Sequence, residues 1–437
     1  QGFKPEKRGD KNITITSSDG DKIDLTLTPG LPLEIKTVDG KSKGEPIVID
    51  GTKDIVIELD GGDADPQSRL HVQMVCKLVG TPIMYDVIVV KARNKIYIPK
   101  EAFKNFEGSP SPFMKNNTLI VNRVTETVIN ESDAGALRTI SAYMDWWPVT
   151  VGGDLSKGNM ITMGFDSTKN TNISINLKTS GEYSFSAQKA GPYLSPPVKL
   201  MKKVAVGSFV VRGNMTATQT TTEGDWLVTR KKWFPEYSDA TWQLLTEKLY
   251  AQFKNQLETE FGMTVLPMSQ VVGADAYAYA KPITDNATKN FVEIGAGGTK
   301  RILTTSGNDV FKDLSITFPS DFVSERLVKE LDVDAVIAVT IDLNFNYASE
   351  GLDPKISIEA FAPNVSYKTA AKYFSMQANT SAKSLNESKK LSGTTDEILY
   401  NMIKADDFIT GFVGAMKQLS AKEDEYPVYE HLWKAKL

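Results

Sequence analysis

Short runs in which apolar and polar residues alternate recur from the amino terminus to about residue 195. Asn12–Thr16 and Asn172–Leu177 are two clear examples. Alternation with a period of two is typical of strands that bury one face. Clusters of Gly, Pro and Asp separate the runs at intervals of roughly ten residues, a spacing that favours sandwiches and barrels. We therefore predict an all-β, sandwich- or barrel-like amino-terminal region. It is expected to form one domain over 1–108, with 109–195 as a second domain or a continuation of the first.

A proline-rich segment, Gly191–Pro197, separates this region from a second kind of pattern. Three prolines lie within its last six residues. Because proline cannot donate a backbone hydrogen bond and disfavours helix, the segment predicts a stiff, extended linker. We therefore predict a multidomain chain with a boundary here and a separate domain over 196–437.

Strand and helix patterns follow one another in this second domain. Lys203–Val211 is mostly apolar and predicts a buried strand. Ser238 is expected to cap a long amphipathic helix that ends at Gly262. Ala335–Ile341 is apolar on both faces and predicts a central strand, and a final helix is expected at about 395–417. These patterns predict an α/β domain with a mixed sheet.

The order of these elements resembles a known group of envelope proteins. The resemblance rests on Lys203–Val206, on Gly262–Pro267 after the long helix, and on Leu331–Ile337, which leads into the central strand. These segments are similar to the periplasmic α/β domain shared by curli-secretion lipoproteins, lipoprotein activators of penicillin-binding proteins and the TolB amino-terminal domain. The resemblance covers about 202–420. It implies a non-enzymatic protein that assembles, anchors or activates partners, with no catalytic residue.

The chain departs from that group in two ways. It begins with Gln1, whereas a lipoprotein of the group would begin with an acylated Cys. The stretch 269–319 is much longer than an ordinary connection, and we expect it to be a surface flap, a docking hairpin or disordered.

Composition excludes several classes of function. The chain has one cysteine, Cys76, and two histidines, His71 and His431. No disulfide can form within it, and a His/Cys zinc site is nearly excluded. Cys76 lies in an alternating run and is interpreted as a half-buried apolar residue. A net charge of −4 without a basic block argues against nucleic acid as a partner, and no apolar stretch is long enough for a transmembrane helix.

Two observations suggest a location outside the cytosol. The chain begins at Gln1 without an initiator Met, as after removal of a signal peptide. It also carries nine Asn-X-Ser/Thr sequons, typical either of a glycosylated secreted protein or of an Asn/Thr/Ser-rich bacterial envelope protein. Both interpretations predict a periplasmic or extracellular protein.

Three motifs that could carry chemistry are each interpreted as structural. Gly295–Lys300 lacks the Gly-Lys pair of a phosphate-binding loop and predicts a flexible turn. Asp60–Asp65 lacks the distal Glu of a calcium loop and predicts a solvated acidic turn. Ser186 and Lys189 have the spacing of a Ser-x-x-Lys motif but lie in a strand pattern. We predict no catalytic residue, no metal and no cofactor.

Two aromatic clusters are the candidate binding surfaces. The first lies near residue 145 and the second follows the first strand of the α/β domain, beside three consecutive cations. In an extended segment two adjacent Trp rings point to opposite faces, so one ring of the first cluster should be exposed. The alternative is that each ring packs in the core of its own domain. The candidate residues are Tyr143, Trp146 and Trp147 in the first cluster and Trp226, Trp233, Phe234 and Tyr237 in the second.

The sequence thus leads to one expected function and two alternatives. We expect a non-enzymatic secreted or periplasmic protein that acts in the assembly or docking of an envelope complex, with an envelope or outer-membrane protein as partner. One alternative is a carbohydrate-binding module that uses Trp146 or Trp147. The other is a peptidoglycan-directed hydrolase that uses carboxylates, which cannot be identified without geometry.

Overall fold

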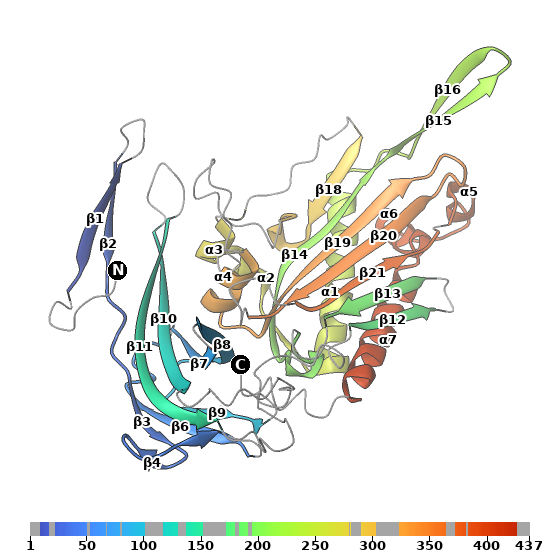
Figure 1. The fold of residues 1–437 in the computed structure, drawn as a ribbon. Helices are drawn as coiled ribbons and strands as arrows, with labels where there is room; N and C mark the ends of the chain where they lie inside the picture. Colours follow the sequence, from blue (N-terminus) through green and yellow to red (C-terminus); the bar gives the residue numbers. More distant parts are fainter. Residues whose placement is uncertain are drawn as a thin grey trace. The chain divides into compact units, whose positions relative to one another are not determined.

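The computed structural model describes residues 9–16, 22–49, 53–66, 68–78, 81–100, 117–129, 137–151, 172–179, 183–190, 195–278, 280, 290–302, 323–363, 372–381 and 383–425. The chain divides into two compact units (Figure 1). Unit 1 is built mainly from residues 1–169, and unit 2 from 170–307 and 318–427.

Unit 1 is mostly strand, as predicted for the amino-terminal region. A hairpin joins β1 (Lys11–Thr16) to β2 (Lys22–Leu27). A four-stranded sheet has the order β4 (Lys41–Ser42), β3 (Glu34–Val38), β6 (Ile55–Asp60), β9 (Lys95–Ile98). A five-stranded sheet has the order β5 (Val48–Ile49), β11 (Leu137–Val151), β10 (Asn117–Ile129), β7 (Arg69–Leu78), β8 (Thr81–Lys91).

One hydrophobic cluster contains side chains from both larger sheets of unit 1. The alternation predicted from the sequence determines which side chains enter it: in β6, Ile55, Ile57 and Leu59 are buried. Arg123 of β10 is also fully buried, and its guanidinium donates hydrogen bonds to the backbone carbonyls of Leu31, Pro32 and Gly61. A buried charge requires such partners, so Arg123 fixes the segment before β3 to the sheet.

Unit 2 is built on a mixed sheet. β14 (Lys203–Asn214) runs parallel to β19 (Ala335–Phe345) and β17 (Thr264–Val265), while the remaining pairs are antiparallel. A further strand, β18 (Phe291–Gly295), pairs antiparallel with β14. The order is β12 (Ile173–Lys178), β13 (Ser184–Lys189), β21 (Lys372–Asn379), β20 (Leu352–Phe361), β19 (Ala335–Phe345), β14 (Lys203–Asn214), β17 (Thr264–Val265).

Helices cover the two faces of this sheet unequally (Figure 1). The large core lies between the sheet and three helices, α1 (Asp239–Phe261), α6 (Thr395–Met402) and α7 (Ala405–Glu423). On the other face a smaller cluster joins β14 and β19 to α2 (Met268–Val272), α3 (Asp275–Ala278) and α4 (Val323–Glu330). The short elements are η4 (Val198–Leu200), η5 (Ala296–Gly298) and α5 (Leu385–Ser388).

The predicted central strand and its helix are confirmed. β19 lies between β14 and β20, and Val336 and Ile337 are buried on its opposite faces. Ser238 caps α1, because its side chain accepts a hydrogen bond from the backbone N–H of Thr241. Gly262 ends α1 with φ of 61°, a left-handed conformation that favours glycine.

The position of the predicted linker differs from expectation. β12 and β13 precede the proline-rich segment, yet β13 pairs with β21 and so belongs to the sheet of unit 2. The sheet therefore extends to the amino-terminal side of the boundary predicted at residue 195. Pairing between strands that lie far apart in the sequence leaves no local signal, so the alternation of 172–189 could not show which sheet it joins.

Two further details differ from the predicted elements of unit 2. The predicted final helix is two helices, since Lys404 between them has φ of 54°. The stretch 269–319 is partly integral to the fold, since it contributes β18, α3 and most of α2. Its residues 303–319 lie outside the described part.

Candidate functional site: a projecting hairpin

A two-stranded hairpin extends from the sheet of unit 2 (Figure 1). β15 (Thr216–Glu223) and β16 (Trp226–Trp233) pair antiparallel along their whole length, from Thr216 opposite Trp233 to Glu223 opposite Trp226. The β-branched threonines of β15 favour the extended chain. Gly224, with φ of 60°, allows the tight turn.

The apolar side chains of the hairpin are largely in solvent. Trp226 and Leu227 at the tip are each 77% exposed, and Trp233 near the base is 58% exposed. Side chains alternate along a strand, so Trp226 lies on one face of the hairpin and Leu227 and Trp233 lie on the other. Exposed apolar groups of this size gathered on one element are typical of interaction sites.

The base of the hairpin is held firmly to the body of unit 2. Lys232 forms an ion pair with Glu350 at 2.5 Å, and its ammonium lies 4.4 Å from the centre of the Tyr347 ring. The hydrogen bond from Lys232 lowers the pKa of the Glu350 carboxyl. Phe234 is 4% exposed and packs with its ring centroid 5.6 Å from that of Phe345. The tip is therefore presented from a fixed base.

The three cations beside the aromatic cluster have different surroundings. Arg230 pairs with Glu223 across the hairpin at 2.5 Å, and Lys232 pairs with Glu350. Lys231 lies 5.9 Å from the centre of the Trp233 ring and has no carboxylate partner in the part of the chain that the structure describes. It is the cation of this group that is available to a partner.

The structure corrects the second predicted cluster. Trp226 and Trp233 are exposed, but Phe234 is buried and Tyr237 is half-buried against the ring of Trp242, with centroids 6.2 Å apart. Phe234 and Tyr237 therefore form the core beneath the hairpin and do not line its surface. Leu227 was not among the predicted residues, although its place at the turn next to Trp226 could have indicated exposure.

The first predicted cluster is divided between surface and core. In β11, Trp146 is 55% exposed and Trp147 is 1% exposed, which confirms that one of the adjacent rings faces solvent. Tyr143 is half-buried beside the core of unit 1. Trp147 is a core residue and not a docking residue, and a binding role for Trp146 stays a prediction.

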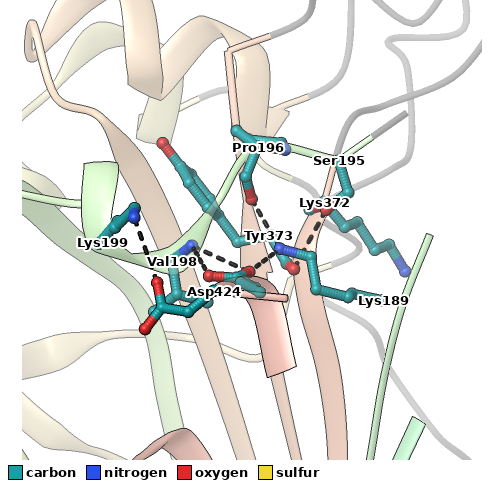
Figure 2. A network of polar contacts seen from close by, with 9 residues as sticks. Lys189, Ser195, Pro196, Val198, Lys199, Lys372, Tyr373 and Asp424 are labelled. Carbon is teal, nitrogen blue, oxygen red and sulfur yellow. Dashed lines mark hydrogen bonds and ion pairs between the residues drawn. The ribbon is translucent and has the colours of Figure 1, made fainter. Parts of the chain in front are cut away.

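A buried polar network in unit 2 has the groups of a catalytic site but serves the fold (Figure 2). The ammonium of Lys189, in β13, forms an ion pair with the carboxylate of Glu423, at the end of α7, and both side chains are excluded from solvent. Lys189 also donates to the carbonyl of Pro196 at 2.8 Å. Glu423 accepts a hydrogen bond from the backbone N–H of Val198 at 2.9 Å. The network thus ties the proline-rich segment to both β13 and α7.

Burial shifts the pKa of both groups of this pair. It lowers the pKa of Lys189 to about 8, an effect that Glu423 offsets only in part. It also raises the pKa of Glu423. The signal for this pair is visible in the sequence: Phe185, Ala187 and Lys189 occupy the same inward face of a strand, and a lysine there needs a partner.

Ser186 and Lys189 lie in β13, as their strand pattern predicts. Ser186 and Lys189 are three residues apart in a strand and so lie on opposite faces of the sheet. Ser195, which lies near Lys189 in Figure 2, is buried and donates to the carbonyls of Lys372 and Tyr373. The Ser186 hydroxyl therefore lies on the other face of the sheet from Lys189, and the Ser195 hydroxyl is bonded to the backbone.

The remaining motifs are also structural where they are described. Gly295–Lys300 forms a tight turn, in which the buried Thr299 hydroxyl donates to the carbonyl of Ala296 at 2.8 Å. Among the described residues no group of three potential metal ligands comes together. No helix in the described ranges is both long and apolar enough to cross a membrane. No family model matches this chain, and no curated protein is significantly similar to it.

Proposed function

We propose that the protein is a non-enzymatic component of the cell envelope, secreted or periplasmic, that docks onto a partner protein through the hairpin β15–β16. The observation that carries the proposal is the exposure of Trp226 and Leu227 at the tip of an arm whose base is fixed. The resemblance of the second half to envelope assembly proteins, and the nine Asn-X-Ser/Thr sequons, support the same class of role.

The arrangement of the tip indicates how a partner would bind it. Because Trp226 and Leu227 lie on opposite faces, a flat partner surface could cover only one of them. A cleft that encloses the tip would bury both, and large rings buried at the centre of an interface contribute most to affinity. Lys231, on the same face as Leu227 and Trp233, favours a partner with a carboxylate beside that cleft.

The proposal is tested by comparing two variants for binding in an envelope extract of the native cells, followed by measurement with the purified partner. The double variant W226A/L227A removes the tip. The variant W146A removes an exposed Trp of unit 1 as a matched control. We expect W226A/L227A to weaken partner binding by about 2 kcal/mol or more, roughly thirtyfold, without changing the melting temperature.

W146A is expected to bind the partner as the wild type does. If W146A loses binding and W226A/L227A keeps it, the interaction surface lies on unit 1 and the proposal is wrong. Retention of the wild type on glycan resins, lost in W146A, would favour the carbohydrate-binding alternative instead.

A further inference from the structure

The sheet of unit 2 has a polar face over four neighbouring strands, β12, β13, β21 and β20. α7 packs on the opposite face of β12 and β13, and Figure 1 shows α1, α6 and α7 on one side of the sheet. Because side chains alternate along each strand, the apolar ones face those helices and the polar ones lie on the opposite face of the sheet. One row of polar residues runs across the strands in register, through Asn176, Ser186, Gln377 and Ser357.

Two adjoining hollows lie on this face, toward the strand ends. The larger has a volume of about 480 Å³ and the smaller about 280 Å³, and they share Lys178, Ser184 and Asn379 in their linings. The volume of the larger hollow is within the range of small-molecule sites. Pro354 lines the larger hollow, and no aromatic ring of the described residues does, so a ligand there would be held by hydrogen bonds and charge.

Two lysines flank the larger hollow. The register places Lys178 opposite Ser184, Ser184 opposite Asn379, and Asn379 opposite Lys355. Three strand spacings therefore separate the two lysine backbones, about 14 Å, with a hydroxyl and an amide between them. Both lysines are exposed, and neither has a hydrogen bond or ion pair within the described ranges.

One further group defines the chemistry of the hollow. Asp353 is the one carboxylate among the described residues of the lining, and it accepts a hydrogen bond from the side-chain amide of Asn346 at 2.6 Å. The described lining thus offers two cations, an amide and serine hydroxyls, against one carboxylate.

We propose that this hollow binds an anionic saccharide, either a sugar phosphate or a sugar acid. The phosphate or carboxylate would pair with Lys178 or Lys355. The sugar hydroxyls both donate and accept, and so match the Asn379 amide and the Ser184 hydroxyl. This site is separate in residues from the hairpin and does not depend on its docking role.

The test is isothermal titration of the full chain at low ionic strength with four probes: glucose 6-phosphate, glucuronic acid, glucose and inorganic phosphate. We expect at least one of the two anionic sugars to bind at least tenfold more tightly than glucose and than phosphate. Comparison of glucose 6-phosphate with glucuronic acid identifies which anion the site prefers. The double variant K178A/K355A, at two exposed positions, should lose at least tenfold in affinity with an unchanged melting temperature.

K231A, which removes the exposed Lys231 of the hairpin, is the matched control and should bind the sugars as the wild type does. Equal binding of phosphate and glucose 6-phosphate, with no binding of glucuronic acid, would mean an adventitious ion only and would overturn the proposal. Equal loss in K231A and K178A/K355A would mean nonspecific charge attraction and would also overturn it. Loss of sugar binding leaves the hairpin proposal intact, because W226A/L227A tests that separately.

Discussion

The ion pair between Lys189 and Glu423 gives the sharpest test of how unit 2 is held together. Its side chains are 0% and 1% exposed, so removing either one leaves the other charge buried. Removal of one partner from a buried pair costs about 3–5 kcal/mol, whereas replacing both with apolar residues of similar volume is often neutral or stabilising. The perturbations are K189M, E423L and the double variant K189M/E423L.

The contacts of each group indicate which partners each single variant leaves behind. K189M leaves the Glu423 carboxylate accepting from the backbone N–H of Val198, and it removes the donor to the carbonyl of Pro196. E423L leaves the Lys189 ammonium with the Pro196 carbonyl. We expect each single variant to lose about 3–5 kcal/mol of unfolding free energy in unit 2, and the double variant to lie within about 1 kcal/mol of wild type.

The assay is urea unfolding followed by hydrogen-exchange mass spectrometry, because peptides from β13 and α7 report unit 2 separately from unit 1. A double-mutant cycle then gives the coupling between the two groups. Single losses below about 1 kcal/mol would show that the pair is hydrated. A double variant as unstable as the sum of the single variants would show that the two side chains do not act as a pair.

Three further predictions concern the same fold. Burial lowers the folded-state pKa of Lys189 to about 8, below its ordinary value of 10.5, so the unfolded chain binds more protons than the folded chain between these pH values. The wild type should therefore gain stability relative to K189M/E423L as pH rises from 8 to 10.5. Urea midpoints of the two proteins that change in parallel over this range would refute this. I337A should cost unit 2 about 2–4 kcal/mol by lost burial and a cavity, and an unchanged melting temperature would contradict the central position of β19. W147A should destabilise unit 1 by about 3–5 kcal/mol while W146A changes it by less than about 0.5 kcal/mol, and thermal melts showing equal losses would contradict their opposite orientations.

Local features of the fold could be predicted from the sequence, and nonlocal ones could not. The cap at Ser238 and the left-handed Gly262 depend on neighbouring residues, so the bounds of α1 were predicted almost to the residue. The pairing of β13 with β21 joins segments about 190 residues apart, and alternation alone carries no information on the partner strand. The burial of Glu423 could not be predicted for the same reason, because its partner Lys189 lies at the other end of the sequence of unit 2.

The candidate site shows the same division. The exposure of one ring of Trp146 and Trp147 follows from strand alternation and was predicted. The burial of Phe234 depends on Phe345, which packs beneath it from a distant strand, so the sequence grouped it wrongly with the exposed rings. The polar hollow on the sheet required four strands in register and had no counterpart in the sequence analysis.

The central claim, that the hairpin tip docks a partner protein, is tested most directly by site-specific photo-crosslinking in the native envelope. A photoreactive residue replaces Leu227 at the tip or, as control, Leu244 of α1, which is 59% exposed. The account predicts one dominant crosslinked species from position 227 that is absent from position 244 and is lost when Trp226 is also replaced by Ala. Identical crosslinking patterns from the two positions, or none from position 227, would contradict it.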